Sequence, residues 1–257
     1  MWKNLLLLLL FVAPFNLKAQ FTSKDISKSL LLGKLDYNEN VDFVKVNDDH
    51  ASKTTFLNKE VYDAFLKMYE KASSDGIELK IISGARNFEH QKAIWERKWQ
   101  RLADIDPHSR TQQILEFSSM PSTSRHHWGT DIDLNNLENS YFESGQGKKE
   151  YDWLVKHAPE FGFYQVYTSK NSGRTGYSEE KWHWSYLPLA NRYLQAYNSV
   201  VSYEDIEGFE GAFLAEEYKM ISHYVNGVSE QFESLVSAEE ISEEILNLSE
   251  DVKNLSR

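Results

Sequence analysis

Apolar side chains in the middle of the chain change from helical to strand spacing and back, a pattern typical of a domain that mixes helices with short strands. Between Lys59 and Gly76, the side chains of Val61, Phe65 and Tyr69 recur every four residues. This spacing predicts a helix with one buried side and a glycine at its end.

The next segment predicts a strand followed by a second helix. Residues 77–81 alternate apolar with charged side chains until Ser83 and Gly84 interrupt the pattern, so we expect one buried face and one wet face. Asn87 then supplies an N-terminal cap for a helix whose apolar positions keep helical spacing to about Ala103.

Shorter elements are predicted on both sides of these three. Residues 43–46 favour one short strand in an otherwise irregular N-terminal stretch. After the second helix the pattern predicts, in order, a short helix over residues 112–117, a strand over 130–134, a short helix over 151–158, a strand over 163–167, a glycine-bearing loop over 169–178 and an alternating aromatic and polar run over 182–186.

Residues 1–19 have the layout of a secretory signal peptide. Lys3 provides the positive start, residues 5–12 the apolar centre and Ala19 a small residue at the end. The apolar run is shorter than the roughly 20 residues that a membrane-spanning helix needs. We therefore expect signal removal, no membrane span in the mature protein, and a periplasmic or secreted location; a retained N-terminal anchor is the alternative.

The composition is that of a globular protein without cysteine. Of the 257 residues, 41% are hydrophobic and 14% aromatic, which is enough for a core and excludes a disordered or fibrous chain. The lack of cysteine in the sequence excludes disulfide scaffolds and thiolate zinc sites.

The net charge of −11 comes from the C-terminal part of the sequence alone. Residues 204–257 contain 14 acidic and three basic side chains, whereas the 25 acidic and 25 basic side chains before them cancel. A protein that binds the phosphate backbone of nucleic acids has a cluster of excess basic residues, and neither part of this sequence has one. The sequence therefore argues against nucleic-acid binding.

The same C-terminal part carries helical patterns, first over residues 212–225 and then over 232–252. We expect an acidic helical extension there. Acid-rich helical faces are usually solvated surface; the sharper interpretation is a docking site for a basic partner.

Side chains able to hold a metal ion gather around two of the predicted strands. His126 and Asp133 belong to one, and His183 belongs to the other, with Glu180 just before it. Two imidazoles and one carboxylate form the ligand set of a catalytic zinc that leaves its fourth position to water. Such a set carries one negative charge, so the ion stays positive and can lower the pKa of its water to about 7.

Spacing alone leaves the choice of ligands on the first strand open. His127, Asp131 and Asp133 have the same parity and so fit one face of a strand. His126 reaches Asp133 only if the chain turns at Gly129.

The acidic residues before the second strand are equally ambiguous. Glu179 is in phase with His183, and Glu180 is not. Glu180 can therefore join the site only from a loop that precedes the strand.

Three segments in the middle of the chain resemble the VanY-type family of zinc D-alanyl-D-alanine carboxypeptidases, which trim the peptide stems of bacterial cell walls. The family's Ser-x-x-Arg-x-x-x-x-Gln is similar to residues 83–91, its Ser-x-His-x-x-Gly-x-x-x-Asp to residues 124–133, and its Glu-x-Trp-His to residues 180–183. The resemblance covers about residues 57–186 in the right order, and the three motifs together are specific.

The resemblance implies an α+β fold of the hedgehog and DD-peptidase type, in which a small antiparallel sheet carries a zinc site and helices flank it. It also implies roles for seven residues: zinc ligation by His126, Asp133 and His183, general-base catalysis by Glu180, a grip on a substrate carboxyl or the scissile carbonyl by Arg86, and help in substrate binding from Gln91 and Ser124.

Two positions depart from the family's pattern. Asp131 stands where many members carry a small residue, and Ser185 stands where several carry arginine. Both departures bear on the shape of the substrate pocket and leave the metal ligands unchanged.

The chemistry of these side chains agrees with the implied roles. A zinc ion with a neighbouring carboxylate supplies the nucleophile, the polarised carbonyl and the proton that peptide hydrolysis needs, and Glu180 would move that proton from the water to the leaving amine. The guanidinium of Arg86 is a rigid fork of donors that suits a carboxylate or an oxyanion; an ion pair on the surface is its ordinary alternative.

The sequence thus predicts a secreted carboxypeptidase with Zn²⁺ as cofactor and peptidoglycan stem peptides as partners, which it cuts at the terminal D-amino-acid bond. A zinc-bearing module that binds wall peptides without catalysis is one alternative, and it has no need of Glu180. A peptidoglycan endopeptidase is another. The predicted parts are the signal peptide (1–19), an N-terminal wrap (20–58), the zinc carboxypeptidase domain (59–203) and the acidic extension (204–257).

Overall fold

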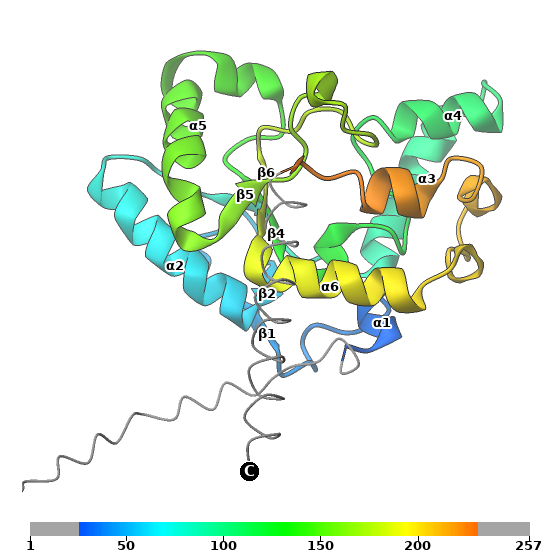
Figure 1. Cartoon of the computed structure of the whole chain (residues 1–257), viewed down its shortest axis with the longest axis horizontal. Coiled ribbons are helices and arrows are strands. Elements are labelled where there is room, and N and C mark those ends of the chain that lie inside the picture. The colour runs from blue at the N-terminus through cyan, green and yellow to red at the C-terminus, as the bar shows by residue number, and fades with distance from the viewer. Residues whose placement is uncertain (1–25, 231–257) are drawn as a thin grey trace, which may run out of the picture.

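The computed structural model describes residues 26–230, drawn in colour in Figure 1. Its strands are β1 (Phe43–Lys45), β2 (Phe56–Asn58), β3 (Ile81–Ser83), β4 (Asp131–Leu134), β5 (Phe163–Gln165) and β6 (His183–Tyr186). Its α-helices are α1 (Lys28–Leu31), α2 (Lys59–Ser74), α3 (Phe88–Arg101), α4 (Pro107–Ile114), α5 (Gly145–His157) and α6 (Leu187–Val200). Shorter helical turns are η2 (Arg125–Trp128), η3 (Asn139–Glu143), η4 (Ala158–Phe161), η5 (Lys170–Ser172), η6 (Tyr203–Asp205), η7 (Ala212–Leu214) and the π-helix η8 (Met220–Val225). The predicted α+β class is confirmed.

The four-stranded antiparallel sheet has the order β3-β4-β6-β5, and β1 pairs with β2 in a separate two-stranded sheet. In the central pair, Asp131 of β4 lies opposite Ser185 of β6, and Asp133 lies opposite His183. Because successive side chains point to opposite faces of a strand, these four share one face and Ile132 belongs to the other. The sheet therefore has one polar face at its centre.

The apolar face of the sheet packs on α2 and α5, which lie on the same side of it in Figure 1. Ile132 is buried in one cluster with Phe65 of α2 and Leu154 of α5. The predicted helix from Lys59 is confirmed, and the side chain of Asn58 caps it by accepting from the Glu60 N–H at 3.0 Å.

The other side of the sheet faces α3 and α6 (Figure 1). The side chain of Asn87 caps α3 by accepting from the His90 N–H at 2.9 Å, as its position in the sequence predicts. On α3, Trp95 and Trp99 lie in a second apolar cluster.

The N-terminal segment braces the turn that precedes β4. The indole of Trp128 donates to the Leu31 carbonyl at 3.2 Å, and the hydroxyl of Tyr37 donates to the His127 carbonyl at 2.9 Å. Both bonds are buried, so they hold residues 125–128 at a defined height above the sheet.

The predicted strand over residues 77–81 is shorter than expected, because β3 begins only at Ile81. Along residues 78–80, before β3, the side chain of Asn135 makes the hydrogen bonds that a neighbouring strand would make. Its side-chain amide accepts from the Lys80 N–H at 2.7 Å and donates to the Glu78 carbonyl at 2.8 Å. Because a side chain satisfies these backbone groups, they do not pair with the backbone of another strand.

The predicted helix over residues 112–117 is wrong in position, since α4 occupies residues 107–114. Asp106 caps it by accepting from the N–H groups of His108 and Ser109, and Pro107 occupies its first turn. Proline and an aspartate cap are start signals, so the boundary was readable in the sequence. Helix α5 also starts six residues before the predicted range of 151–158.

Helix α6 has no counterpart among the predicted elements. It follows β6 directly and starts without a side-chain cap at Tyr186. Its buried residues have helical spacing, but the aromatic run before them predicts a strand. They include Leu187, Ala190, Tyr193, Leu194 and Tyr197.

The predicted helix over residues 212–225 is wrong as a single element. Gly211, with a φ of 79°, precedes the short turn η7, and Lys219, with a φ of 52°, separates η7 from η8. Leu214 and Met220 are buried in the same cluster as Trp95, so this segment is held by packing.

The predicted signal peptide and the helical pattern over residues 232–252 lie outside the described residues. Docking of a basic partner to the acidic extension therefore stays a prediction. Among residues 26–230, no helix combines the length and the apolar character needed to cross a membrane.

Candidate active site

His126 lies on a turn in front of β4. Residues 125–128 form η2, and Gly129 follows with a φ of 68°, in the region that favours glycine. A Cβ at this glycine would collide with the ring of Phe43 and the backbone nitrogen of Asn58. The turn at Gly129 is the one that His126 needs in order to reach Asp133.

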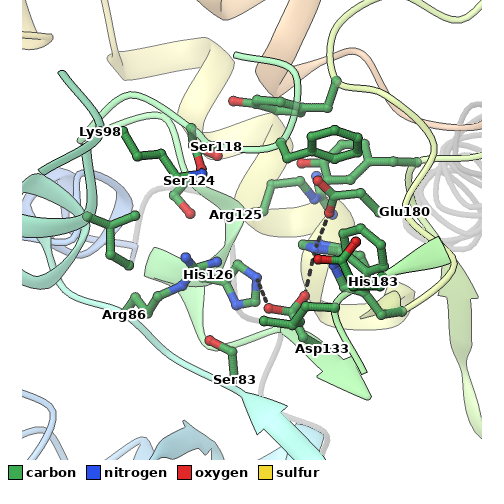
Figure 2. A pocket seen from close by; sticks show the side chains of 18 of the residues that line it. Ser83, Arg86, Lys98, Ser118, Ser124, Arg125, His126, Asp133, Glu180 and His183 are labelled. Atoms are coloured by element: carbon green, nitrogen blue, oxygen red, sulfur yellow. Dashed lines mark hydrogen bonds and ion pairs between the residues drawn. The ribbon is translucent and has the colours of Figure 1, made fainter. Parts of the chain in front are cut away.

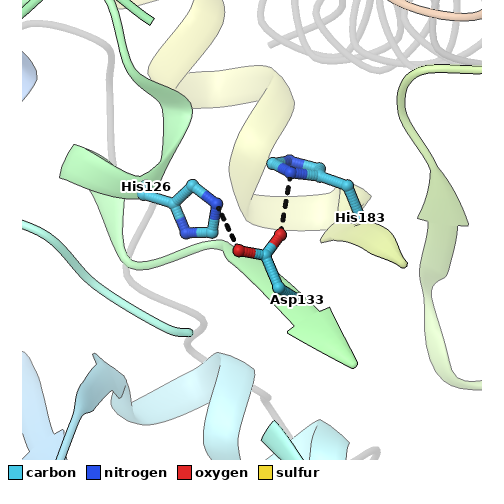
Figure 3. Close-up of side chains that lie close together, drawn as sticks. All are labelled: His126, Asp133 and His183. Atoms are coloured by element: carbon cyan, nitrogen blue, oxygen red, sulfur yellow. Dashed lines mark ion pairs between the residues drawn. The ribbon is translucent and has the colours of Figure 1, made fainter. Parts of the chain in front are cut away.

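The side chains of His126, Asp133 and His183 converge on one point (Figure 3). Nε2 of His126 lies 3.4 Å from Oδ2 of Asp133, and Nδ1 of His183 lies 3.1 Å from Oδ1. The ligand atoms of all three residues lie within 4.8 Å of one another. A tetrahedral zinc with bonds of about 2.1 Å holds its ligand atoms about 3.4 Å apart, so the three residues fit one such ion.

Hydrogen bonds on the far side of each ring turn the correct nitrogen toward this point. Nδ1 of His126 lies 2.8 Å from the Gly84 carbonyl and donates to it, and among the described residues no group forms a hydrogen bond with its buried Nε2. Nε2 of His183 donates to Oδ2 of Asp131 at 2.8 Å, which turns Nδ1 toward Asp133. Histidine binds a metal in its neutral form, and two such imidazoles with one carboxylate are a donor set that suits zinc.

Three carboxylates surround the ring of His183. Burial lowers the pKa of this histidine, but its hydrogen bonds with Asp131, Asp133 and Glu180 raise it more, so the net pKa lies well above its usual value. Burial likewise raises the pKa of Asp133, yet the charges and hydrogen bonds of His126 and His183 lower it below the usual range. The electric field at this point favours a cation.

Behind His183, Asp131 is the centre of a fully buried hydrogen-bond network. Its Oδ2 accepts from His183 and from Nε of Arg125 at 3.0 Å, and its Oδ1 accepts from the hydroxyls of Ser185 at 2.6 Å and Thr130 at 2.7 Å. Nη2 of Arg125 also donates to Ser185 at 3.1 Å. A carboxylate behind a metal-binding histidine orients the ring and raises its basicity.

Asp131 and Ser185 were expected to bear on the shape of the substrate pocket, and the structure corrects this. The two residues face each other across β4 and β6, are fully buried and lie behind the ring of His183. The two departures from the family's pattern thus contact each other, since the hydroxyl of Ser185 donates to Asp131. The guanidinium that pairs with Asp131 comes from Arg125, on the turn before β4.

Replacing Asp131 with asparagine should weaken zinc binding by about 10- to 100-fold. The amide keeps the shape of the carboxylate and can still accept from His183, but it removes the negative charge that makes the ring a strong ligand. Competition with a chromophoric chelator measures the affinity, and Ser185→Ala, which touches Asp131 without touching His183, is the control. An unchanged affinity in Asp131→Asn would limit the network to a role in folding.

Glu180 enters the site from the loop before β6, as the parity of the sequence requires. Its N–H donates to the Tyr167 carbonyl at 2.9 Å, and its Oε2 lies 3.4 Å from Nδ1 of His183. Burial raises the pKa of its carboxyl, against the opposing effect of His183. Glu179 is half-buried outside this cavity, and its carbonyl accepts from the side chain of Asn139.

A cavity of about 640 Å³ opens in front of the convergent side chains (Figure 2). Arg86 and Ser124 lie on its wall, as expected for residues that bind substrate. Nε of Arg86 and the hydroxyl of Ser124 are buried and have no hydrogen-bond partner among the described residues. Buried polar groups are rarely left without partners, so these two atoms mark places where a ligand can bind.

Gln91 lies apart from this cavity, so the help in substrate binding that the resemblance implied for it stays a prediction. The side chain is 1% exposed and is not part of the cavity wall. Its amide nitrogen donates to the Ser119 carbonyl at 2.7 Å. Gln91 therefore supports the loop that carries Ser118, which does line the cavity.

His127, which shares the parity of Asp133, is also a structural residue. Its Nδ1 donates to the Arg86 carbonyl at 2.6 Å, and its Nε2 accepts from the Ser122 N–H at 3.1 Å. Burial lowers the pKa of His127 to about 3, so the ring stays neutral. With both nitrogens occupied, His127 holds the backbone of Arg86 in place.

A family model described as VanY, D-alanyl-D-alanine carboxypeptidase, matches residues 54–189. Among curated proteins, the chain is 25% identical over 146 residues to "Putative carboxypeptidase YodJ" of Bacillus subtilis (strain 168), which covers 56% of this chain and 51% of that protein. It is 27% identical over 127 residues to a D-alanyl-D-alanine carboxypeptidase of Enterococcus faecalis (strain ATCC 700802 / V583), covering 48% and 45%. The chain thus spans about half the length of the curated relatives it matches.

Among solved structures, the chain is similar to a vancomycin-resistance D,D-pentapeptidase, VanY, in complex with Zn(II). The sequence identity is 20% and the TM-score is 0.48, over 67% of this chain and 93% of that chain.

Proposed function

Since the chain belongs to the VanY D-alanyl-D-alanine carboxypeptidase family, whose model matches more than half of it, we propose that it is a secreted or periplasmic, zinc-dependent carboxypeptidase. Its substrates are peptidoglycan stem peptides, from which it removes the terminal D-amino acid. The observation that carries this proposal is the convergence of His126, Asp133 and His183 on one point, with the carboxylate of Glu180 beside it.

The residues around this point divide the work of peptide hydrolysis. Zinc, when bound, acidifies water and polarises the scissile carbonyl. The carboxylate of Glu180 accepts the proton of the attacking water and delivers it to the leaving amine. The backbone hydrogen bond from the Glu180 N–H to the Tyr167 carbonyl fixes the backbone of Glu180, so its carboxylate needs little reorganisation for the reaction.

Arg86 and Ser124 hold the substrate in register with Glu180. The guanidinium of Arg86 binds the terminal carboxylate through paired hydrogen bonds, which selects a free C-terminus. The hydroxyl of Ser124 donates to a substrate oxygen. Both side chains come from segments next to the metal ligand His126. Ser124 precedes it by two residues, and the Arg86 N–H donates to the His126 carbonyl at 3.0 Å.

Replacing Arg86 with lysine should lower kcat/KM by about 10- to 100-fold while the zinc content stays unchanged, because an ammonium cannot form the paired hydrogen bonds of a guanidinium. Steady-state kinetics on a pentapeptide stem and metal analysis measure the two quantities. The matched control is Arg101→Lys, at the exposed end of α3. A kcat/KM equal to that of the unchanged protein would remove Arg86 from substrate binding.

Defined muropeptides test the function itself. The purified protein is incubated with monomeric and cross-linked muropeptides, with and without a chelator, and the products are weighed by mass spectrometry. We expect the loss of one terminal alanine from the monomers, which the chelator stops and added zinc restores. Cleavage of cross-linked dimers would indicate an endopeptidase instead, and binding without any cleavage would indicate a non-catalytic module.

A further inference from the structure

The cavity wall opposite the metal ligands carries cations that the proposed reaction does not use. Helix α3 presents His90, Ile94, Arg97 and Lys98 to the cavity at four- and three-residue intervals, and Lys53 joins them from the segment before β2. This spacing places the four residues of α3 on one side of the helix. Figure 2 shows Lys98 beside Ser118 and Ser124, across the cavity from Glu180 and His183.

These cations lack acidic partners within residues 26–230. No carboxylate of that part of the chain forms an ion pair with Lys53, Arg97 or Lys98 at 4.0 Å or less. The ammonium of Lys98 donates to the hydroxyl of Ser118 instead. Burial, the largest effect on it, lowers the pKa of Lys98, and the charge of Glu180 across the cavity opposes this without an ion pair between the two residues. A half-buried ammonium with one neutral partner is costly to desolvate, and an anion brought by a ligand would offset that cost.

The charges that line the cavity also favour an anionic ligand. Five fixed cations line the cavity, and one of them, Arg125, is paired with the buried Asp131. The other four, Lys53, Arg86, Arg97 and Lys98, face the three carboxylates of the lining, Asp133, Glu138 and Glu180. A divalent ion between the ligands adds two further positive charges. One terminal carboxylate on Arg86 neutralises only part of this excess, so the cavity can accommodate a second anionic group.

The size of the cavity allows the second group to belong to the same substrate. A volume of about 640 Å³ falls within the range of pockets that enclose a ligand of several residues. A peptide held with its scissile bond at Glu180 therefore has space for further residues next to α3.

We propose that Lys98, oriented by Ser118, forms a second anion subsite that binds a carboxylate of the substrate upstream of the scissile bond. The inference rests on the proposed function, and it names the substrate class: stem peptides with a free carboxylate in addition to the terminal one. Arg97 and Lys53 are exposed at the rim, where they attract the anionic peptide without fixing its position. Lys98 lies deeper and sets the selectivity.

A pair of synthetic peptides tests the subsite. The two peptides are identical except for one upstream side chain, which carries a carboxylate in one and the carboxamide in the other. We expect the unchanged protein to prefer the acidic peptide by about 10-fold or more in kcat/KM, since a hydrogen bond between charged groups is lost in the amide. Moving the carboxylate between the second, third and fourth residue from the C-terminus identifies the position that Lys98 reads.

Variants of Lys98 assign the preference to this side chain. In Lys98→Gln, hydrolysis of the acidic peptide should fall to the rate of the amide, whose own rate stays unchanged. Lys98→Arg should keep the preference, and Lys67→Gln, the same loss of charge on the exposed side of α2, should leave it intact. Equal rates for the two peptides in the unchanged protein, or equal slowing of both peptides by Lys98→Gln, would overturn the subsite.

Calorimetric binding of both peptides separates this inference from the proposed function. If neither peptide is hydrolysed, a tighter Kd for the acidic peptide that disappears in Lys98→Gln would support the subsite while the catalytic proposal fails. Equal Kd values for the two peptides would rule the subsite out.

Discussion

Glu180→Gln should lower kcat on stem peptides by at least ~100-fold, and the protein should keep one zinc ion per chain. The amide has the shape of the carboxylate, so the packing around Tyr167 and His183 stays in place. It cannot accept a proton from water, however. Neither buried aspartate nearby can replace it, because Asp133 faces the two histidines and Asp131 lies behind His183. Single-turnover mass spectrometry with zinc-loaded protein measures the loss.

The neighbouring residue supplies the control for this prediction. Glu179→Gln makes the same chemical change one position away, outside the cavity, and should leave kcat as it is. If Glu179→Gln were the damaging change and Glu180→Gln were harmless, the assignment of the general base would be wrong. If both variants were fully active, peptide hydrolysis at this site would not use a carboxylate base.

His183→Ala should remove zinc from the protein and abolish hydrolysis. The change deletes one of three ligands, and the two that remain, His126 and Asp133, cannot hold the ion against dialysis. The loss of one ligand from a zinc site costs several kcal/mol of binding, because each ligand bond contributes to a total of about 10–16 kcal/mol. Elemental analysis after dialysis gives the zinc content, and a thermal melt shows whether the variant is folded.

A histidine far from the site controls for non-specific zinc binding. The side chain of His108 is exposed next to Glu217, and His108→Ala should keep both the zinc and the activity. If His183→Ala retained one zinc per chain with unchanged affinity, the ion would belong to another group of residues.

The seven residues implied by the motifs could be located in the sequence, but their geometry could not. Strand parity places His127 on the face of Asp133 directly and allows His126 there only if the chain turns at Gly129, and parity alone does not show whether such a turn is present. The decisive feature is local: Gly129 adopts a positive φ that lifts η2 out of the strand's register. The parity of Glu180 relative to His183 correctly predicted that Glu180 joins the site from a loop before the strand.

The network behind His183 was out of reach of sequence reasoning. Arg125, Asp131 and Ser185 come from a turn and two strands, and their contacts depend on the register between β4 and β6. No pattern along one segment contains that register. Gln91 shows the opposite case, in which a motif residue proves to support a loop.

Helices were predictable where they carry both a cap and a stripe of apolar residues. Helices α2 and α3 have asparagine caps and were placed correctly, whereas α6 follows a strand without a cap and was missed. The segment after Gly211 has apolar residues at helical spacing, but the positive φ of Lys219 interrupts it and packing against Trp95 holds it. Helical spacing thus shows which side chains are buried more reliably than it shows a continuous helix.

Anomalous diffraction at the zinc absorption edge, from crystals of the zinc-loaded protein, tests the central claim most directly. We expect one strong peak about 2.0–2.2 Å from Nε2 of His126, a carboxylate oxygen of Asp133 and Nδ1 of His183. A zinc-loaded crystal with no peak between these three side chains, or with its peak on other residues, would contradict the account.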